Sequence, residues 1–133
     1  LDATTPTPSA NLAAASDTGA QGDLLTNLAS VTIEGTAEPG ALVEIVGTAT
    51  SVTANGSGLY TLTNVPLSSG VNNFSIRATD VAGNQATTAI SITRDSNTPT
   101  PTALLDSASD SGVQGDRITN LPGVTIQGTA EPG

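Results

Sequence analysis

The sequence contains no cysteine, histidine, methionine, tryptophan or lysine. Without cysteine and histidine the chain has no soft-metal site, no thiol nucleophile and no imidazole base, so zinc centres and most familiar enzyme mechanisms are excluded. The absence of cysteine also excludes disulfides. We therefore expect a protein that is not an enzyme, and any metal that it binds must be held by oxygen atoms.

Positive charge is almost as scarce. The basic residues are Arg77, Arg94 and Arg117, against twelve acidic residues, which gives a net charge of −9. Nucleic acid and anionic membranes are poor partners for such a chain, whereas divalent cations are good ones. No apolar run approaches the roughly 18 residues of a membrane span, so we expect no membrane insertion. Leu1 is not followed by a signal-peptide pattern, and an export signal is expected to lie outside this sequence.

The chain repeats itself at an offset of 93 residues. The stretch SDTGAQGDLLTN, residues 16–27, returns as SDSGVQGDRITN at residues 109–120, and residues 5–40 match residues 98–133 at 25 of 36 positions. A period of this length is typical of tandem whole domains. It predicts a complete repeat with its linkers at residues 1–97 and the first two strands of a second repeat at residues 98–133. Two strands rarely stand alone in water, so the second segment is expected to be poorly ordered or completed by strands of another chain.

Alternation of apolar and polar residues predicts strands throughout the first repeat, and no stretch has helical spacing. Turn-forming stretches separate the strands: AEPG at 37–40, NGSG at 55–58 and DVAGN at 80–84. With Ala10–Ala15 as the first strand and Thr50–Ala54 as the fourth, seven strands result, which favours an antiparallel β-sandwich. The five alternating segments are Val31–Glu34, Val43–Ile45, Tyr60–Thr63, Phe74–Thr79 and Ile90–Thr93.

An ordered set of motifs carries a family resemblance. SDTGAQGDLLTN, GTAEPGALVEI, NGSGLYTLT, ATDVAGNQA and RDSNTP follow one another in this order. Together they resemble the bacterial immunoglobulin-like (BIg) domains that repeat in giant surface adhesins, including those exported with RTX-type tails. The resemblance implies an all-β, immunoglobulin-like sandwich in a tandem array, located outside the cell at the bacterial surface. It also implies that the partners are neighbouring repeats of the same polypeptide and that calcium is bound at their junctions.

Immunoglobulin topology would place the candidate calcium ligands at the two ends of the domain. Loop 16–28 would lie at the end where the chain leaves, and turn 80–84 at the end where it arrives, together with turns 37–40 and 55–58. Calcium takes about six to eight oxygen ligands, which acidic loops supply. The alternative is that Asp17 and Asp23 only close Asx turns. The predicted metal ligands are Asp17, Asp23 and Asp95 at one junction, Asp2, Asp80 and Asn84 at the other, and Asp110 and Asp116 in the second copy.

These features favour a structural extender module of a cell-surface adhesin, made rigid by calcium between domains. The alternative is a subunit of an extracellular filament or sheath, in which copies of the chain complete one another by strand exchange. A sugar-binding module is disfavoured because Tyr60 and Phe74 are the only aromatic residues. Glu34, Glu38 and Glu44 are scattered and give no paired-carboxylate catalytic arrangement.

Overall fold

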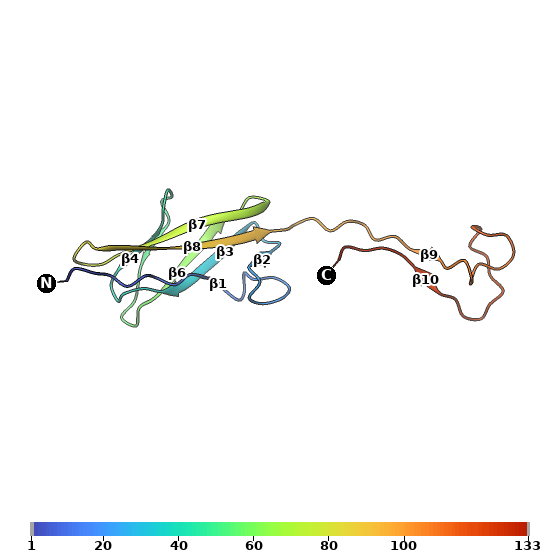
Figure 1. The fold of residues 1–133 in the computed structure, drawn as a ribbon, viewed down its shortest axis with the longest axis horizontal. Coiled ribbons are helices and arrows are strands. Elements are labelled where there is room, and N and C mark those ends of the chain that lie inside the picture. The colour runs from blue at the N-terminus through green and yellow to red at the C-terminus, as the bar shows by residue number, and fades with distance from the viewer. Residues whose placement is uncertain (1, 133) are drawn as a thin grey trace. The chain divides into compact units, whose positions relative to one another are not determined.

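The computed structural model describes residues 2–132 and divides the chain into two compact units, one ending at Ser96 and the other beginning at Asn97 (Figure 1). The regular secondary structure in this range is strand, which confirms the all-β prediction. None of residues 2–132 belongs to a helix with the length and apolar character needed to cross a bilayer.

The first unit is a sandwich of two sheets. One sheet has the strand order β1-β3-β6 and the other has the order β2-β8-β7-β4-β5. The five strands predicted from alternation are all present. The bounds are β1 Asn11–Leu12, β2 Leu25–Thr26, β3 Ser30–Thr36, β4 Leu42–Ile45, β5 Ser51–Thr53, β6 Leu59–Pro66, β7 Gly70–Thr79 and β8 Gln85–Arg94.

The N-terminal part of this sandwich differs from the prediction. The strand expected over Ala10–Ala15 is limited to β1, and the segment expected to be a plain loop contains β2. Strand β2 pairs in parallel with β8, with Leu25 opposite Thr93. The amide of Asp95 then donates to the carbonyl of Thr26 at 2.8 Å. The chain thus crosses from one sheet to the other within its first 26 residues and lies against its own last strand.

The core between the sheets is built from aliphatic side chains, as period-two alternation requires. One face of each long strand is buried, while its other face is open to solvent. Tyr60 is also buried, whereas Phe74 is only partly buried at the edge of the core. The largest fully buried apolar side chains are Ile33, Leu62, Ile76, Ile92, Val43 and Val65.

Tyr60 fastens the N-terminal segment to the sandwich. Its hydroxyl donates to the backbone carbonyl of Ser9 at 2.5 Å, and burial raises the pKa of Tyr60 to about 12. Ser9 also donates its amide to the carbonyl of Thr36 at 2.9 Å. Gly35 permits this approach, because a Cβ at that position would lie 2.1 Å from the Ser9 carbonyl oxygen.

The polar loops and turns that the sequence analysis named lie at the two ends of the first unit. We call the end at which residues 2–8 begin the N-terminal pole; turns 37–40, 55–58 and 80–84 lie there. The opposite end, where β8 finishes and loop 16–28 lies, is the C-terminal pole (Figure 1). The polar loops that the sequence analysis identified therefore lie in two groups, one at each pole.

The second unit contains one short strand pair. Strands β9 (Leu104–Leu105) and β10 (Ile126–Gln127) are antiparallel, with Ile126 opposite Leu105. At the offset of 93, this pair corresponds to Ile33 opposite Leu12 in the first unit. That residues 98–133 begin a second repeat stays a prediction, but their local pairing is that of β1 with β3.

Candidate cation-binding loops at the two poles

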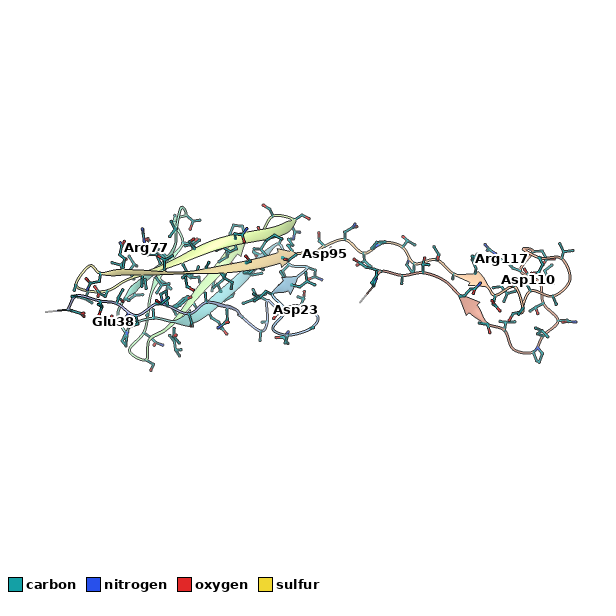
Figure 2. All side chains as sticks on the ribbon, viewed as in Figure 1. Asp23, Glu38, Arg77, Asp95, Asp110 and Arg117 are labelled. Carbon is teal, nitrogen blue, oxygen red and sulfur yellow. The ribbon has the colours of Figure 1, made fainter. Side chains whose placement is uncertain are left out.

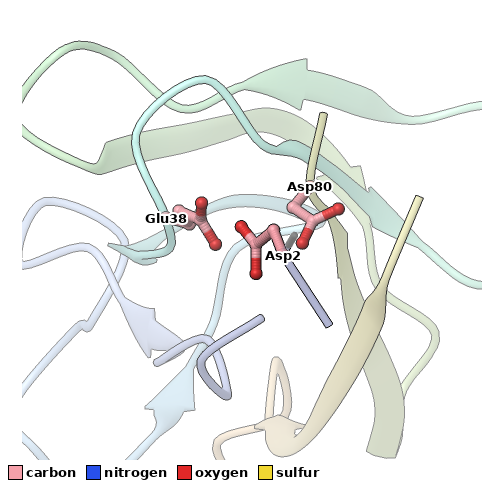
Figure 3. A group of neighbouring side chains, drawn as sticks. All are labelled: Asp2, Glu38 and Asp80. Atoms are coloured by element: carbon pink, nitrogen blue, oxygen red, sulfur yellow. The ribbon is translucent and has the colours of Figure 1, made fainter. Parts of the chain in front are cut away.

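Three carboxylates converge at the N-terminal pole of the first unit. Asp2, Glu38 and Asp80 each place one carboxylate oxygen within 4.8 Å of the others (Figure 3). Asp2 comes from the N-terminal segment, Glu38 from the turn before β4 and Asp80 from the turn after β7. Like charges this close repel one another, so the arrangement favours a bound cation.

Asp80 is fixed by its own turn. Its Oδ1 accepts the backbone N–H of Asn84 at 2.8 Å, and its Oδ2 accepts the side-chain amide of Asn84, also at 2.8 Å. Gly83 adopts φ 91° and closes the turn. The hydrogen bond from the Asn84 side chain, with help from backbone N–H groups, lowers the pKa of Asp80 even though burial opposes the shift. Asp80 is therefore ionised at neutral pH although it is only 7% exposed.

Polar contacts hold the other two carboxylates nearby. The Asn84 side chain donates to the backbone carbonyl of Asp2 at 3.3 Å, and the Thr5 hydroxyl donates to Glu38 at 3.2 Å. Within residues 2–132, Arg77 pairs with Glu44 and Arg94 contacts the carbonyl of Leu67. Neither guanidinium neutralises this group.

The predicted set for this pole was Asp2, Asp80 and Asn84, and the structure places all three together. Sequence reasoning missed Glu38, which was interpreted as part of a turn. A signal was present: turn 37–40 was expected at the same pole as turn 80–84. A carboxylate in a turn that neighbours an acidic turn is a candidate ligand of the same ion.

At the C-terminal pole, Asp17 points into its own loop. It is 5% exposed, and its Oδ2 accepts the backbone N–H of Gly22 at 2.5 Å. Gln21 donates its side-chain amide to the Asp17 carbonyl. The second carboxylate oxygen, Oδ1, is buried and has no hydrogen-bond partner in the described chain. A buried carboxylate oxygen without a partner is costly, and a cation or a water bound to this atom would remove that cost.

The same arrangement recurs in the second unit. Asp110 is also 5% exposed, its Oδ2 accepts the N–H of Gly115 at 2.7 Å, and Gln114 donates to its carbonyl. Its Oδ1 is again buried without a partner among residues 2–132. The feature therefore belongs to the loop motif and does not depend on the rest of the sandwich.

The remaining predicted ligands behave differently. Asp23 is exposed and accepts the N–H of Leu25 at 3.0 Å, and Asp116 accepts that of Ile118 at 2.9 Å, so each closes an Asx turn. Asp95 is exposed just after the end of β8 (Figure 2), and its backbone N–H donates to the carbonyl of Thr26. In the described part of the chain, Asp17, Asp23 and Asp95 do not form a compact carboxylate group like that at the N-terminal pole.

A comparison with curated proteins gives no match. The pattern of residues 4–96, which includes all eight strands of the first unit, matches a known family, the bacterial Ig-like domain. This match spans well over half of the sequence and agrees with the two-sheet sandwich described above. The chain therefore belongs to the bacterial Ig-like domain family.

Proposed function

We propose that this chain is a structural extender module of a bacterial cell-surface adhesin, whose tandem Ig-like repeats are made rigid by calcium bound at their junctions. Domains of this family are typically structural modules of extracellular or surface proteins. A structural module that only separates two domains needs no acidic residues at its ends. The acidic poles of this domain therefore favour a module that also binds cations.

The observation that carries the calcium part is the group formed by Asp2, Glu38 and Asp80. Hard oxygen ligands from flexible loops suit calcium, which completes its shell with carbonyl groups and water. Three carboxylates supply part of that shell, and a neighbouring repeat is the natural source of further ligands. The partnerless Oδ1 of Asp17 supports a second ion at the opposite pole.

Calcium at both poles would give the module its stiffness. Repeats arranged head to tail bring the C-terminal pole of one domain toward the N-terminal pole of the next. Without an ion, the carboxylates of the two poles repel one another. With calcium between them, both sets of carboxylates are attracted to the same cation. The cation thus turns a repulsive joint into a fixed one.

The test is thermal unfolding of the full chain in calcium and in chelator. An ion that binds only the folded state stabilises it by about 2.7 kcal/mol at one hundred times its dissociation constant. Asp80→Asn and Asp17→Asn should each reduce the calcium-dependent rise in Tm. Glu34→Gln, which removes an exposed carboxylate from β3, is the matched control and should keep the full rise. An unchanged Tm in calcium for the natural chain would refute the calcium role.

The alternative function, a filament or sheath subunit assembled by strand exchange, draws support from the uncovered strands β9 and β10. It predicts polymers whose amount rises with protein concentration. Sedimentation velocity over a wide concentration range separates it from an extender, which stays monomeric.

A further inference from the structure

Turn 55–58 contains the one Asn-Gly pair in the sequence, Asn55–Gly56. The side-chain carbonyl of an asparagine can be attacked by the backbone nitrogen of the next residue, and glycine at that position presents no Cβ to obstruct the attack. Both residues of the pair are exposed at the N-terminal pole. Water, which the later step of this reaction consumes, therefore has free access to them.

The turn activates the side-chain carbonyl of Asn55. Its oxygen, Oδ1, accepts two backbone N–H groups, those of Ser57 and Leu59, each at 2.9 Å. Negative charge develops on Oδ1 when the side-chain carbon is attacked. Two N–H donors that already point at this oxygen stabilise the developing charge without further rearrangement.

The attacking and leaving nitrogens are both unhindered. Within residues 2–132, neither the backbone N–H of Gly56 nor the side-chain NH2 of Asn55 takes part in a hydrogen bond. A Cβ built on Gly56 would meet nothing within 4 Å, so the backbone has room to rotate there. No contact in the described chain thus holds either nitrogen away from the reaction.

Two other asparagines of the first unit serve as internal references. The side-chain NH2 of Asn72 donates to the carbonyls of Ser68 and Gly70, each at 2.9 Å, and that of Asn84 donates to Asp80 at 2.8 Å. Each of these asparagines is followed by a residue with a side chain instead of by glycine. They lack both the free leaving group and the open approach that Asn55 has.

We propose that Asn55–Gly56 is a self-modification site, at which the folded protein converts Asn55 to aspartate and isoaspartate without an enzyme. The Gly56 nitrogen bonds to the side-chain carbon of Asn55, and the bond from that carbon to Nδ2 breaks. The proton lost by the Gly56 N–H passes through water to Nδ2, which leaves as ammonia. One water molecule then opens the cyclic imide at either of its carbonyls. Overall, one water is consumed and one ammonia is released.

The two products change the N-terminal pole differently. Aspartate keeps an oxygen acceptor in the turn and adds a negative charge to a pole that is already acidic. Isoaspartate inserts a methylene group into the main chain, which displaces the Asn55 carbonyl that accepts the Gly58 N–H at 2.9 Å. The Gly58 carbonyl in turn accepts the N–H of Ala37 at 2.8 Å, next to Glu38. Isoaspartate therefore loosens the turn that carries Glu38.

The experiment incubates the full chain in mildly alkaline buffer, either folded or in urea, and follows each asparagine by peptide mass spectrometry. In the folded chain Asn55 should convert at least as fast as in urea. It should also convert roughly tenfold or more faster than Asn72 or Asn84, a barrier difference of about 1.4 kcal/mol. Gly56→Ala is the matched variant: its methyl group obstructs the attack and should slow the conversion of Asn55, while Tm is unchanged because the added Cβ meets nothing.

Three results would overturn the proposal: an Asn55 that converts in urea but not in the folded chain, equal conversion of Asn72 or Asn84, or a Gly56→Ala variant that converts at the natural rate. Hydrogen exchange of the purified isoaspartate form tests the structural effect. The amide of Ala37 should exchange roughly tenfold faster than in the unmodified chain, since its bond to Gly58 is weakened. Unchanged exchange would refute the loosening of turn 37–40.

Discussion

The hydroxyl of Tyr60 donates to the backbone carbonyl of Ser9 across 51 residues of sequence. This bond joins the start of β6 to the segment that precedes β1, and it is formed where the side chain is almost fully buried. Because Tyr60 is the only tyrosine in the chain, a single substitution isolates its contribution.

Tyr60→Phe should lower the free energy of unfolding of the first unit by about 1 to 2 kcal/mol, because the carbonyl of Ser9 loses its side-chain donor while the ring still fills the core. Urea denaturation followed by circular dichroism measures the change. Hydrogen exchange should show the loss concentrated around Ser9. An unchanged midpoint would mean that the Ser9 carbonyl finds another donor at no cost.

Alkaline pH should destabilise the first unit through the same residue. The pKa of Tyr60 is about 12 in the folded protein against 10.0 for the free side chain, so the unfolded chain loses this proton first. The stabilisation is complete below pH 10 and is lost as the pH rises toward 12, by about 2 to 3 kcal/mol in total. No lysine or cysteine titrates in this range. Tyr60→Phe should therefore abolish the decline, and tyrosinate absorbance should rise together with unfolding in the natural chain.

Gly35→Ala should be strongly destabilising, by about 2 kcal/mol or more, because the added Cβ would overlap backbone atoms of Ser9 that cannot move without breaking the contact with Thr36. Gly56→Ala is the matched control, since a Cβ at Gly56 meets nothing within 4 Å. Thermal melts of the two variants make the comparison. Equal melting temperatures would contradict the close packing of Ser9 on β3.

Acid should remove the contribution of Asp80. Its pKa is lowered in the folded state, chiefly by the hydrogen bond from the Asn84 side chain, so its stabilisation is present above the ordinary aspartate pKa and is lost as the pH falls through the lowered value. The stability difference between the natural chain and Asp80→Asn, measured in chelator, should be constant near neutral pH and shrink below about pH 4. A difference that stays constant to about pH 2 would contradict this role.

Period-two alternation was sufficient to predict the long strands, because each depends on residues that are neighbours in sequence. Strand β2 was not predictable in this way. Leu25 and Thr26 are paired only because β8, far along the chain, lies beside them, and their own pattern does not alternate.

The candidate site also has one part that the sequence predicts and another that depends on the fold. The spacing of Asp17 and Asp23 in a repeated motif identified the loop, but it did not reveal that Asp17 turns inward while Asp23 faces solvent. Glu38 joins Asp80 through tertiary proximity, which residue spacing does not encode. Motif repetition thus located the loops, and folding determined which carboxylates meet.

The parallel pairing of β2 with β8 has a consequence for a chain that is pulled from both ends. Tension at the C-terminal side draws β8 along its own direction, while tension at the N-terminal side draws β2 the opposite way. The hydrogen bonds from Thr93 to Leu24 and from Asp95 to Thr26 then lie across the load, so they must rupture together instead of unzipping singly. Tension from the N-terminal side reaches β2 only through β1, so the β2–β8 pair is a second point of resistance that holds after the bonds of β1 with β3 have broken.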